Sequence, residues 1–324
     1  MKKMLASVAL VGAVALAMTG CATDGGNGGG GGGGGDELIT VGFAQTGSES
    51  GWRAANTESL KTALSEENGF KLVFNAADNK QEAQIAAVRS FINQGVDAIV
   101  IAPITVDGWD DVLTEAKDAG IPVILEDRTV SASEDLYESW VGLDFEKEGE
   151  LAGDWAVANA DGANLVVLEG TTGSSAALDR ATGWAKALEG SSINTLDSQT
   201  GDFTRDGGKK VMEGFLQKYG SDIDLLFAHN DDMGLGALDA IEAAGLVPGQ
   251  DIKIVTIDAV HDGMQALADG KFNFIVECNP LLGEKVAELV KKVLAGETVE
   301  KRTIVEDQTF DQEQAKAALP TRPY

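Results

Sequence analysis

Residues able to bind a polyhydroxylated ligand recur along this chain just after short apolar runs. In the first half, Glu49, Trp52 and Arg53 follow one such run, and Asp127 with Arg128 follows another. Carboxylates accept hydrogen bonds from paired hydroxyls, planar guanidinium and amide groups donate to them, and aromatic rings cover apolar C–H faces. This combination suits the binding of a sugar. The candidates of the same kinds in the second half are Asp144, Arg180, Phe203, Arg205, Asn230, Asp258 and Glu277.

Catalytic arrangements are much harder to find. Residues 47–51 have the glycine spacing of a nucleophile elbow, but the central residue is Glu instead of Ser. The two histidines, His229 and His261, are not spaced as metal ligands and stand beside no Ser or Cys nucleophile. Carboxylates such as Asp127 and Asp258 could in principle act as a glycosidase pair, so a carbohydrate-active enzyme stays open as an alternative. We expect no catalytic residue, no metal and no cofactor.

Each candidate also has a structural interpretation. Trp52 could belong to the core, Arg205 could be a solvated surface residue, and Asp258 could cap the helix that follows it. Asp231 fits a helix N-cap better than a ligand contact. The convergence of so many suitable groups on strand ends nevertheless favours binding. The tryptophans inside periodic segments, which we expect to serve packing, are Trp109, Trp140, Trp155 and Trp184.

The elements that must position these residues alternate along the chain. From Leu38 onward, apolar β-rich runs alternate with amphipathic helical stretches, a pattern typical of parallel sheets. Most runs are apolar throughout, as strands covered on both faces require. The expected strands are 39–44, 71–75, 98–102, 123–125, 140–143, 164–168, 225–228, 253–257 and 272–276. Helices expected between them include 52–66, 81–93, 109–118, 146–160, 205–218, 233–243 and 282–294.

The alternation occurs twice. "NQGVDAIVIAP" and "DAGIPVILEDR" in the first half have counterparts in "GSDIDLLFAHND" and "DIKIVTIDAV" in the second. Two similar α/β lobes are therefore expected. Because ligands of open parallel sheets bind beyond the carboxyl ends of the strands, the candidates above should meet at one place.

The N-terminal residues 1–21 are expected to be an export signal, because two lysines precede an apolar run too short to span a membrane. The run closes on Met-Thr-Gly-Cys, which resembles the lipobox of bacterial lipoproteins, although Met18 stands where Leu is usual. Cys21 would then carry a lipid anchor; an ordinary secretory signal with an incidental cysteine is the alternative. Residues 22–36 contain eight consecutive glycines and are expected to be a flexible tether with a reach of roughly 20 Å.

Charge and cysteine content narrow the possible partners. The formal net charge is −27, which repels both nucleic-acid phosphates and anionic membrane surfaces. Nucleic-acid binding is therefore not expected. If Cys21 is lipidated, Cys278 has no cysteine to pair with, so stability must come from the core.

Long stretches of the chain match a known family. "GSESGWRAA", "VRSFINQGVDAIVIAP", "QTGDFTR", "AHNDDM", "EAAGLVPGQDI" and the C-terminal Tyr324 resemble the ribose-type periplasmic binding proteins of ABC importers, and most of all their galactofuranose-binding members. The resemblance covers residues 38–324. It implies two Rossmann-like lobes joined by three crossings, with one monosaccharide buried in the cleft between them.

The resemblance also implies roles for the candidates. In the first lobe, Trp52 would be an aromatic wall, and Asp127 with Arg128 would match the family's hydroxyl-binding "DR" pair. Glu49 and Arg53 belong to "SESGWR", a stretch that resembles the furanose binder more than the ribose binder. In the second lobe, Phe203 would oppose the tryptophan, and the family's sugar-binding positions would be matched by Arg180, Asn230, Asp258 and Glu277.

We therefore predict an α/β protein of the type I periplasmic binding fold, whose two parallel-sheet lobes are joined by a three-crossing hinge near Leu143, Cys278 and Arg302. It should be an exported, lipid-anchored monomer that delivers a monosaccharide, galactofuranose or a related pentose or hexose, to ABC permease subunits by hinge closure. A sugar-sensing repressor of the same fold would carry a basic DNA-binding head where this chain has the expected export signal and glycine tether, so this alternative is not favoured. A sugar sensor for a membrane receptor is a further alternative. The predicted boundaries are 37–143 with 278–304 for the first lobe and 144–277 with 305–324 for the second.

Overall fold

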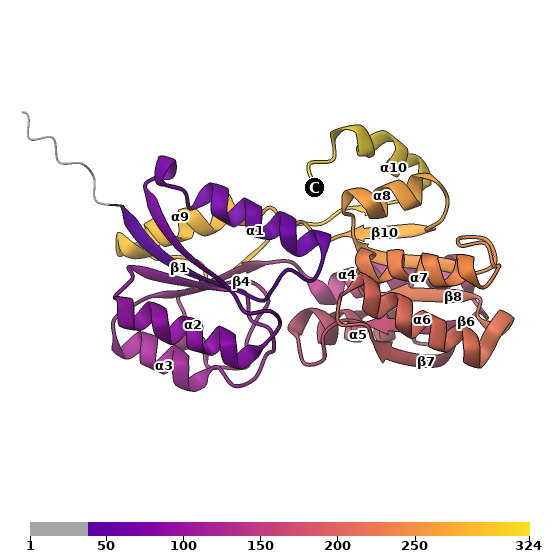
Figure 1. Ribbon diagram of the computed structural model, residues 1–324, viewed down its shortest axis with the longest axis horizontal. Coiled ribbons are helices and arrows are strands. Elements are labelled where there is room, and N and C mark those ends of the chain that lie inside the picture. The colour runs from indigo at the N-terminus through magenta and orange to yellow at the C-terminus, as the bar shows by residue number, and fades with distance from the viewer. Residues whose placement is uncertain (1–37) are drawn as a thin grey trace, which may run out of the picture. The chain divides into compact units, whose positions relative to one another are not determined.

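Two six-stranded sheets organise the part of the chain that the computed structural model describes, residues 38–324 (Figure 1). The expected export signal, Cys21 and the glycine tether lie outside these residues. The first sheet has the order β11-β5-β4-β3-β1-β2, and all its neighbouring strands are parallel. Its strands are β1 (Ile39–Gln45), β2 (Phe70–Ala76), β3 (Ala98–Ile101), β4 (Val123–Asp127), β5 (Ser139–Gly142) and β11 (Arg302–Ile304).

The second sheet repeats this plan with the order β12-β10-β9-β8-β6-β7. Only its short edge strand β12 runs antiparallel to its neighbour. The strands are β6 (Asn164–Glu169), β7 (Asn194–Thr200), β8 (Leu225–Ala228), β9 (Lys253–Asp258), β10 (Phe274–Glu277) and β12 (Thr309–Phe310).

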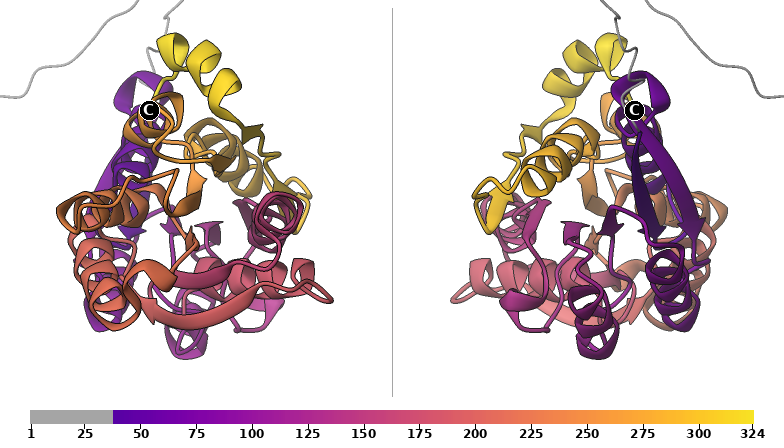
Figure 2. Two further views of the ribbon diagram at one scale, coloured as in Figure 1. Left: turned by 90° about the vertical axis from the view of Figure 1, so that its right-hand side faces the viewer. Right: turned by 90° about the vertical axis from the view of Figure 1, so that its left-hand side faces the viewer.

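Helices cover both faces of each sheet (Figure 2). Those of the first lobe are α1 (Gly51–Ala63), α2 (Gln81–Gln94), α3 (Asp110–Asp118) and α9 (Gly283–Leu294), with the short turns η1 (Glu66–Asn68) and η2 (Glu134–Leu136). Those of the second are α4 (Phe145–Ala160), α5 (Ser175–Ala187), α6 (Arg205–Tyr219), α7 (Asp231–Ala243), α8 (His261–Ala268) and α10 (Gln312–Ala318), with η3 (Gly220–Asp222) and η4 (Leu319–Thr321).

The strands are apolar on both faces because each face meets a helix layer. In β3, Ala98 and Val100 belong to one buried cluster, whereas Ile99 and Ile101 belong to the other. Side chains of a strand alternate between faces, so a four-residue apolar run supplies both clusters. Three of the four tryptophans expected to pack are buried, and Trp155 is partly buried and stacks on Phe274.

The chain passes between the two lobes three times. The crossings run from β5 to α4, from β10 to α9, and from β11 to β12, and in Figure 1 they pass between the two lobes. The predicted fold class, two lobes of mainly parallel sheet, is confirmed. None of the helices in the described part of the chain combines the length and apolar content that crossing a membrane requires.

Some elements carry too little pattern to be predicted. β7 has the polar sequence NTLDSQT and lies at the exposed edge of the second sheet, where one solvated face removes the need for apolar residues. β11 and β12 are very short. Helices α5, α8 and α10 were also not among the expected elements.

Candidate functional site

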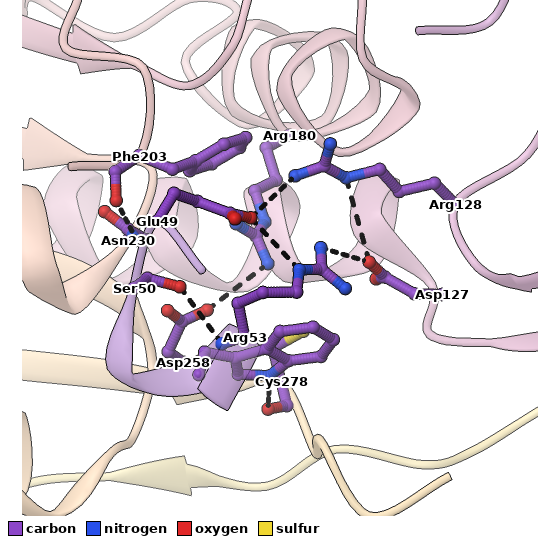
Figure 3. Close-up of a pocket in the computed structure, with 11 residues that line it drawn as sticks. Glu49, Ser50, Arg53, Asp127, Arg128, Arg180, Phe203, Asn230, Asp258 and Cys278 are labelled. Carbon is purple, nitrogen blue, oxygen red and sulfur yellow. Dashed lines mark hydrogen bonds and ion pairs between the residues drawn. The ribbon is translucent and has the colours of Figure 1, made fainter. Parts of the chain in front are cut away.

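A pocket lies between the lobes, where the carboxyl ends of strands from both sheets meet (Figure 3). The first lobe contributes the loop after β1, the start of α1 and the end of β4. The second lobe contributes α5, the loops after β7 and β8 and the end of β9, and the crossing after β10 closes the back. The lining residues are Glu49, Ser50, Trp52, Arg53, Asp127, Arg128, Arg180, Phe203, Asn230, Asp258 and Cys278.

Two arginines and two carboxylates form the first-lobe wall. Arg53 donates from Nη2 to Asp127 Oδ2 at 2.6 Å and from Nε to Glu49 Oε1 at 3.0 Å. Arg128 lies farther from the same carboxylates, at 3.7 Å from Asp127 and 3.8 Å from Glu49. All four side chains are buried. Burial opposes ionisation of Glu49, but the charges of Arg53 and Arg128 hold its pKa below the usual value.

Arg128 is the less compensated of these two cations. Burial and the nearby charge of Arg53 lower the pKa of Arg128 despite its two carboxylate neighbours. Its Nε has no hydrogen-bond partner within residues 38–324. An electron-rich ligand atom placed beside it would supply the missing partner.

A layer of buried amides and carboxyls behind the wall holds Arg53 in place. Asn56 accepts from Arg53 at 3.3 Å and donates to Glu126 at 3.1 Å and to the carbonyl of Pro280 at 3.3 Å. Gln45, at the end of β1, donates to Asn56 at 2.8 Å. Burial and the charge of Asp127 raise the pKa of Glu126 to about 8. These contacts tie the wall to β1, β4 and the second crossing.

The second-lobe wall centres on Arg180. Its Nε donates to Glu148 Oε2 at 2.7 Å, its Nη1 donates to the carbonyl of His229 at 2.5 Å, and its Nη2 lies 3.7 Å from Asp258 Oδ1. Burial and the charge of Arg180 lower the pKa of His229 to about 3, which keeps its imidazole neutral. Burial raises the pKa of Asp258 well above its usual value, and Asp258 Oδ2 has no hydrogen-bond partner within the described residues.

Two aromatic side chains face the polar walls. Trp52 donates from its indole nitrogen to the carbonyl of Cys278 at 2.6 Å, so its ring is fixed against the second crossing. The ring of Phe203 lies 5.3 Å from the Arg128 guanidinium and 5.8 Å from that of Arg180. A Cβ at Gly170 would come within 1.9 Å of this ring, so only glycine leaves room for it.

The backbone is strained where it presents the pocket residues. Asp127, Phe203 and Asp258 have φ values of +60°, +60° and +127°, a region that non-glycine residues seldom adopt. Such strain persists only where the surroundings enforce it, and it concentrates at ligand sites.

The free space between these side chains is about 20 Å³, little more than the roughly 10–15 Å³ that one water needs. A ligand of monosaccharide size would therefore enter only if the lobes separate or the side chains re-orient. Within residues 38–324, no cluster of His, Cys, Asp and Glu could hold a metal ion.

The structure places three of the expected ligand residues outside the pocket. Asp144 is exposed and caps α4 by accepting from the Lys147 amide at 3.0 Å. Arg205 is half-exposed and pairs with carboxylates of α7 and α8. Glu277 is buried but pairs with Arg322 at 2.7 Å. Asp144 and Arg205 follow strands and Glu277 ends β10, but none of the three side chains lines the pocket.

Other differences concern individual residues. Ser50 and Cys278 line the pocket although neither was expected to do so. Ser50 belongs to "SESGWR" and could have been found there. Cys278 lines the pocket because it lies in the crossing after β10, which no sequence signal places beside the ligand candidates. The expectation that Asp231 caps α7 is wrong: Asn230 caps it by accepting from the Met233 amide at 3.0 Å. Asp231 is instead buried and accepts from Thr256 and from the Val260 amide.

The amino-acid sequence matches a known protein family over most of its length. Residues 41–298 match the periplasmic binding protein domain. The chain is 46% identical over 288 residues to the galactofuranose-binding protein YtfQ of Escherichia coli, covering 87% of this chain and 90% of that protein.

Solved structures agree with this match. A Mycobacterium smegmatis protein in complex with β-D-fucofuranose is 57% identical, with a TM-score of 0.85, over 89% of this chain and 96% of that one. The periplasmic binding protein of an arabinose ABC transporter from Shewanella sp. ANA-3, bound to α- and β-L-arabinofuranose, is 43% identical with a TM-score of 0.85, over 88% and 95% of the two chains.

Proposed function

Since this chain belongs to the periplasmic binding proteins that serve sugar ABC importers, we propose that its pocket holds one monosaccharide in the furanose ring form. The relatives named above bind galactofuranose, fucofuranose and arabinofuranose. Membership in the family indicates an extracytoplasmic location.

One observation carries the proposal. Among the residues that the structure describes, the first lobe presents a buried arginine, Arg128, whose Nε has no hydrogen-bond partner, and the second presents a buried carboxyl, Asp258, whose Oδ2 has none. A sugar hydroxyl both donates and accepts hydrogen bonds, so one polyol placed between the lobes can partner both groups. A purely anionic or purely cationic ligand would satisfy only one of them.

The remaining pocket residues would complete the recognition. Arg53 and Arg180, held rigidly by buried partners, would donate to ring and hydroxyl oxygens, and Asp127 would accept from hydroxyls. Trp52 and Phe203 would cover the apolar faces of the ring. Asn230 lines the pocket with its amide already engaged, since it donates to the Phe203 carbonyl at 3.1 Å and caps α7; it would thus support the aromatic wall.

Hinge closure would follow from this division of the site. Each lobe holds half of the ligand's partners, so a bound sugar is fully satisfied only when the lobes meet, and it shifts the equilibrium toward the closed form. The three crossings are the segments that would bend. The closed form would then be the one that the permease subunits accept.

We also propose binding without catalysis, in a monomer anchored through Cys21. Support for the anchor comes from the residues before Cys21, and support for the absence of catalysis comes from relatives that are transporter binding proteins. Release of free sugar from a furanoside incubated with the protein would contradict the second point. Expression without residues 1–21 should yield a soluble protein with unchanged sugar affinity.

A thermal-shift panel of galactose, arabinose, ribose, fructose and glucose tests the function directly. We expect the sugars that form furanose rings most readily, fructose and ribose among them, to raise the melting temperature more than glucose. A panel in which no sugar stabilises the protein would reject the proposed function.

A further inference from the structure

Three hydrogen bonds join the two lobes at the rim of the cleft. The Gly51 amide donates to Asp232 Oδ2 at 2.7 Å, the Val106 amide to the carbonyl of Gly173 at 2.9 Å, and the Thr129 amide to Ser175 Oγ at 3.0 Å. Only the first uses a charged side chain. Asp232 does not line the pocket.

The Asp232 carboxylate lies between two helix N-termini. It belongs to the first turn of α7 in the second lobe, and it accepts from the first residue of α1 in the other lobe. A helix N-terminus carries partial positive charge and free amide groups that a carboxylate stabilises. The first turn of α1 contains no acidic residue, so the opposite lobe provides the negative charge that α1 lacks.

Asp232 is held in this position from the side. Its Oδ1 lies 3.3 Å from Arg205, which also reaches Asp262 at 3.2 Å on α8. The side chain of Asp232 is 9% exposed and that of Arg205 is 48% exposed. Arg205, which sequence reasoning assigned to the ligand, thus orients the carboxylate that reaches across the cleft.

The contact acts on the pocket through α1. Gly51 is followed directly by Trp52 and Arg53, and preceded by Glu49 and Ser50, which all line the pocket. A bond to the start of α1 therefore fixes the segment that supplies much of the first-lobe wall. It can form only when the lobes are closed.

We propose that Asp232 is a latch that stabilises the closed state by capping α1 across the cleft, so that it sets how long a bound ligand is retained without touching it. The effect on ligand retention rests on the proposed function, whereas the effect on lobe position does not.

Gly51 is the position at which the donor can be removed, although a proline there also puts a ring carbon where the amide hydrogen pointed, toward Asp232 Oδ2. It is the first residue of α1, where proline is tolerated, and the preceding Ser50 has the extended conformation that a following proline needs, with ψ of 164°. Gly51→Pro deletes the amide hydrogen. Gly51→Ala keeps it, and the added Cβ would meet Asp232 Oδ2 at an ordinary 3.4 Å, which makes it the matched control.

The test measures lobe separation and ligand release in Gly51→Pro, Gly51→Ala, Asp232→Asn and the double variant Gly51→Pro/Asp232→Asn. Spin labels at Asp118→Cys on α3 and Glu213→Cys on α6, both exposed, report the distance between the lobes with and without D-galactose. Stopped-flow Trp fluorescence reports the dissociation rate of D-galactose.

We expect Gly51→Pro to broaden the label distances toward longer values and to speed dissociation about tenfold to a hundredfold, as loss of one charge-assisted hydrogen bond implies. Asp232→Asn keeps an oxygen that can accept the bond but loses the charge, so it should act in the same direction more weakly. Gly51→Ala should resemble the wild type, and the double variant should be no worse than Gly51→Pro, since both changes act on one bond. Unchanged distances in Gly51→Pro and Asp232→Asn would overturn the latch. If the wild-type protein closes but does not bind D-galactose, the result would count against D-galactose as the ligand. The label distances would then decide whether the latch exists.

Discussion

The substitution Asp258→Asn should have opposite effects on stability and on binding. Asp258 ends β9 with a backbone φ of +127°, and its carboxyl is buried with Oδ2 unpartnered within residues 38–324. Burial raises its pKa well above the usual value, although Arg180 opposes the rise. Asparagine keeps the shape of the side chain, cannot ionise, and tolerates positive φ better than most residues.

The ligand-free protein should gain stability from this change. A buried carboxyl whose pKa is raised destabilises the folded state once it ionises, and its removal should add about 1 kcal/mol at neutral pH, or roughly 2–4 °C in melting temperature. Because the folded-state pKa of Asp258 is raised, its contribution to stability is largest below pH 3.8 and declines as the pH rises. The gain from Asn should therefore be larger at pH 8 than at pH 5.

Sugar affinity should fall in the same variant. Asn puts an amide where a carboxyl oxygen would meet a sugar hydroxyl, and a buried polar group left without its partner costs about 1–3 kcal/mol, so binding should weaken by a factor of about 5 to 150. Calorimetry gives the affinity, and thermal unfolding of the sugar-free protein gives the stability. Asp118→Asn, on the exposed end of α3, is the control and should change neither by much. Unaltered affinity together with a lower melting temperature would refute the role given to Asp258.

Two further predictions concern the hinge. Burial is the main cause that raises the pKa of Asp307, in the third crossing, to about 9. At neutral pH the Asp307 carboxyl is therefore protonated in the folded protein and ionised in the unfolded chain. The free energy of unfolding should fall as the pH rises toward 9. Asp307→Asn should make this decline shallower by about 1 kcal/mol per pH unit between pH 6.5 and 8.5, as urea titrations at several pH values would show; an equal slope in both proteins would contradict it. Trp52→Phe keeps the aromatic wall but loses the 2.6 Å bond to the Cys278 carbonyl, so calorimetry should show affinity about fivefold weaker, against a far greater loss in Trp52→Ala. Equal affinities of the Phe and Ala variants would count against the wall.

Much of the pocket follows from the sequence because of how parallel sheets are built. The carboxyl ends of parallel strands meet at one edge, so residues such as Asp127, Arg128 and Asp258 could be grouped from their places after apolar runs. The bare apolar character of those runs also predicted sheets covered on both faces. Both inferences use one-dimensional patterns that directly reflect burial.

The sequence could not show which way a side chain points once its strand has ended. Asp144, Arg205 and Glu277 also lie at or after the ends of strands, yet Asp144 caps a helix, Arg205 contacts Asp232 at the rim and Glu277 pairs with Arg322 in the C-terminal segment. The contacts of Arg205 and Glu277 are made with residues distant in the chain, whereas Asp144 contacts the amide of the nearby Lys147. β7 escaped prediction for a different reason, since a solvated edge strand has no apolar signature.

The central claim, that the pocket holds a furanose, is tested most directly with two ring-locked forms of galactose. 5-Deoxygalactose lacks the hydroxyl that closes the six-membered ring and forms a furanose, whereas 4-deoxygalactose lacks the hydroxyl that closes the five-membered ring and forms a pyranose. Titration calorimetry of both against the wild-type protein compares ring forms that each lack one hydroxyl. We predict saturable binding of the 5-deoxy sugar and binding at least tenfold weaker for the 4-deoxy sugar. Tighter binding of the 4-deoxy sugar would contradict the assignment of a furanose.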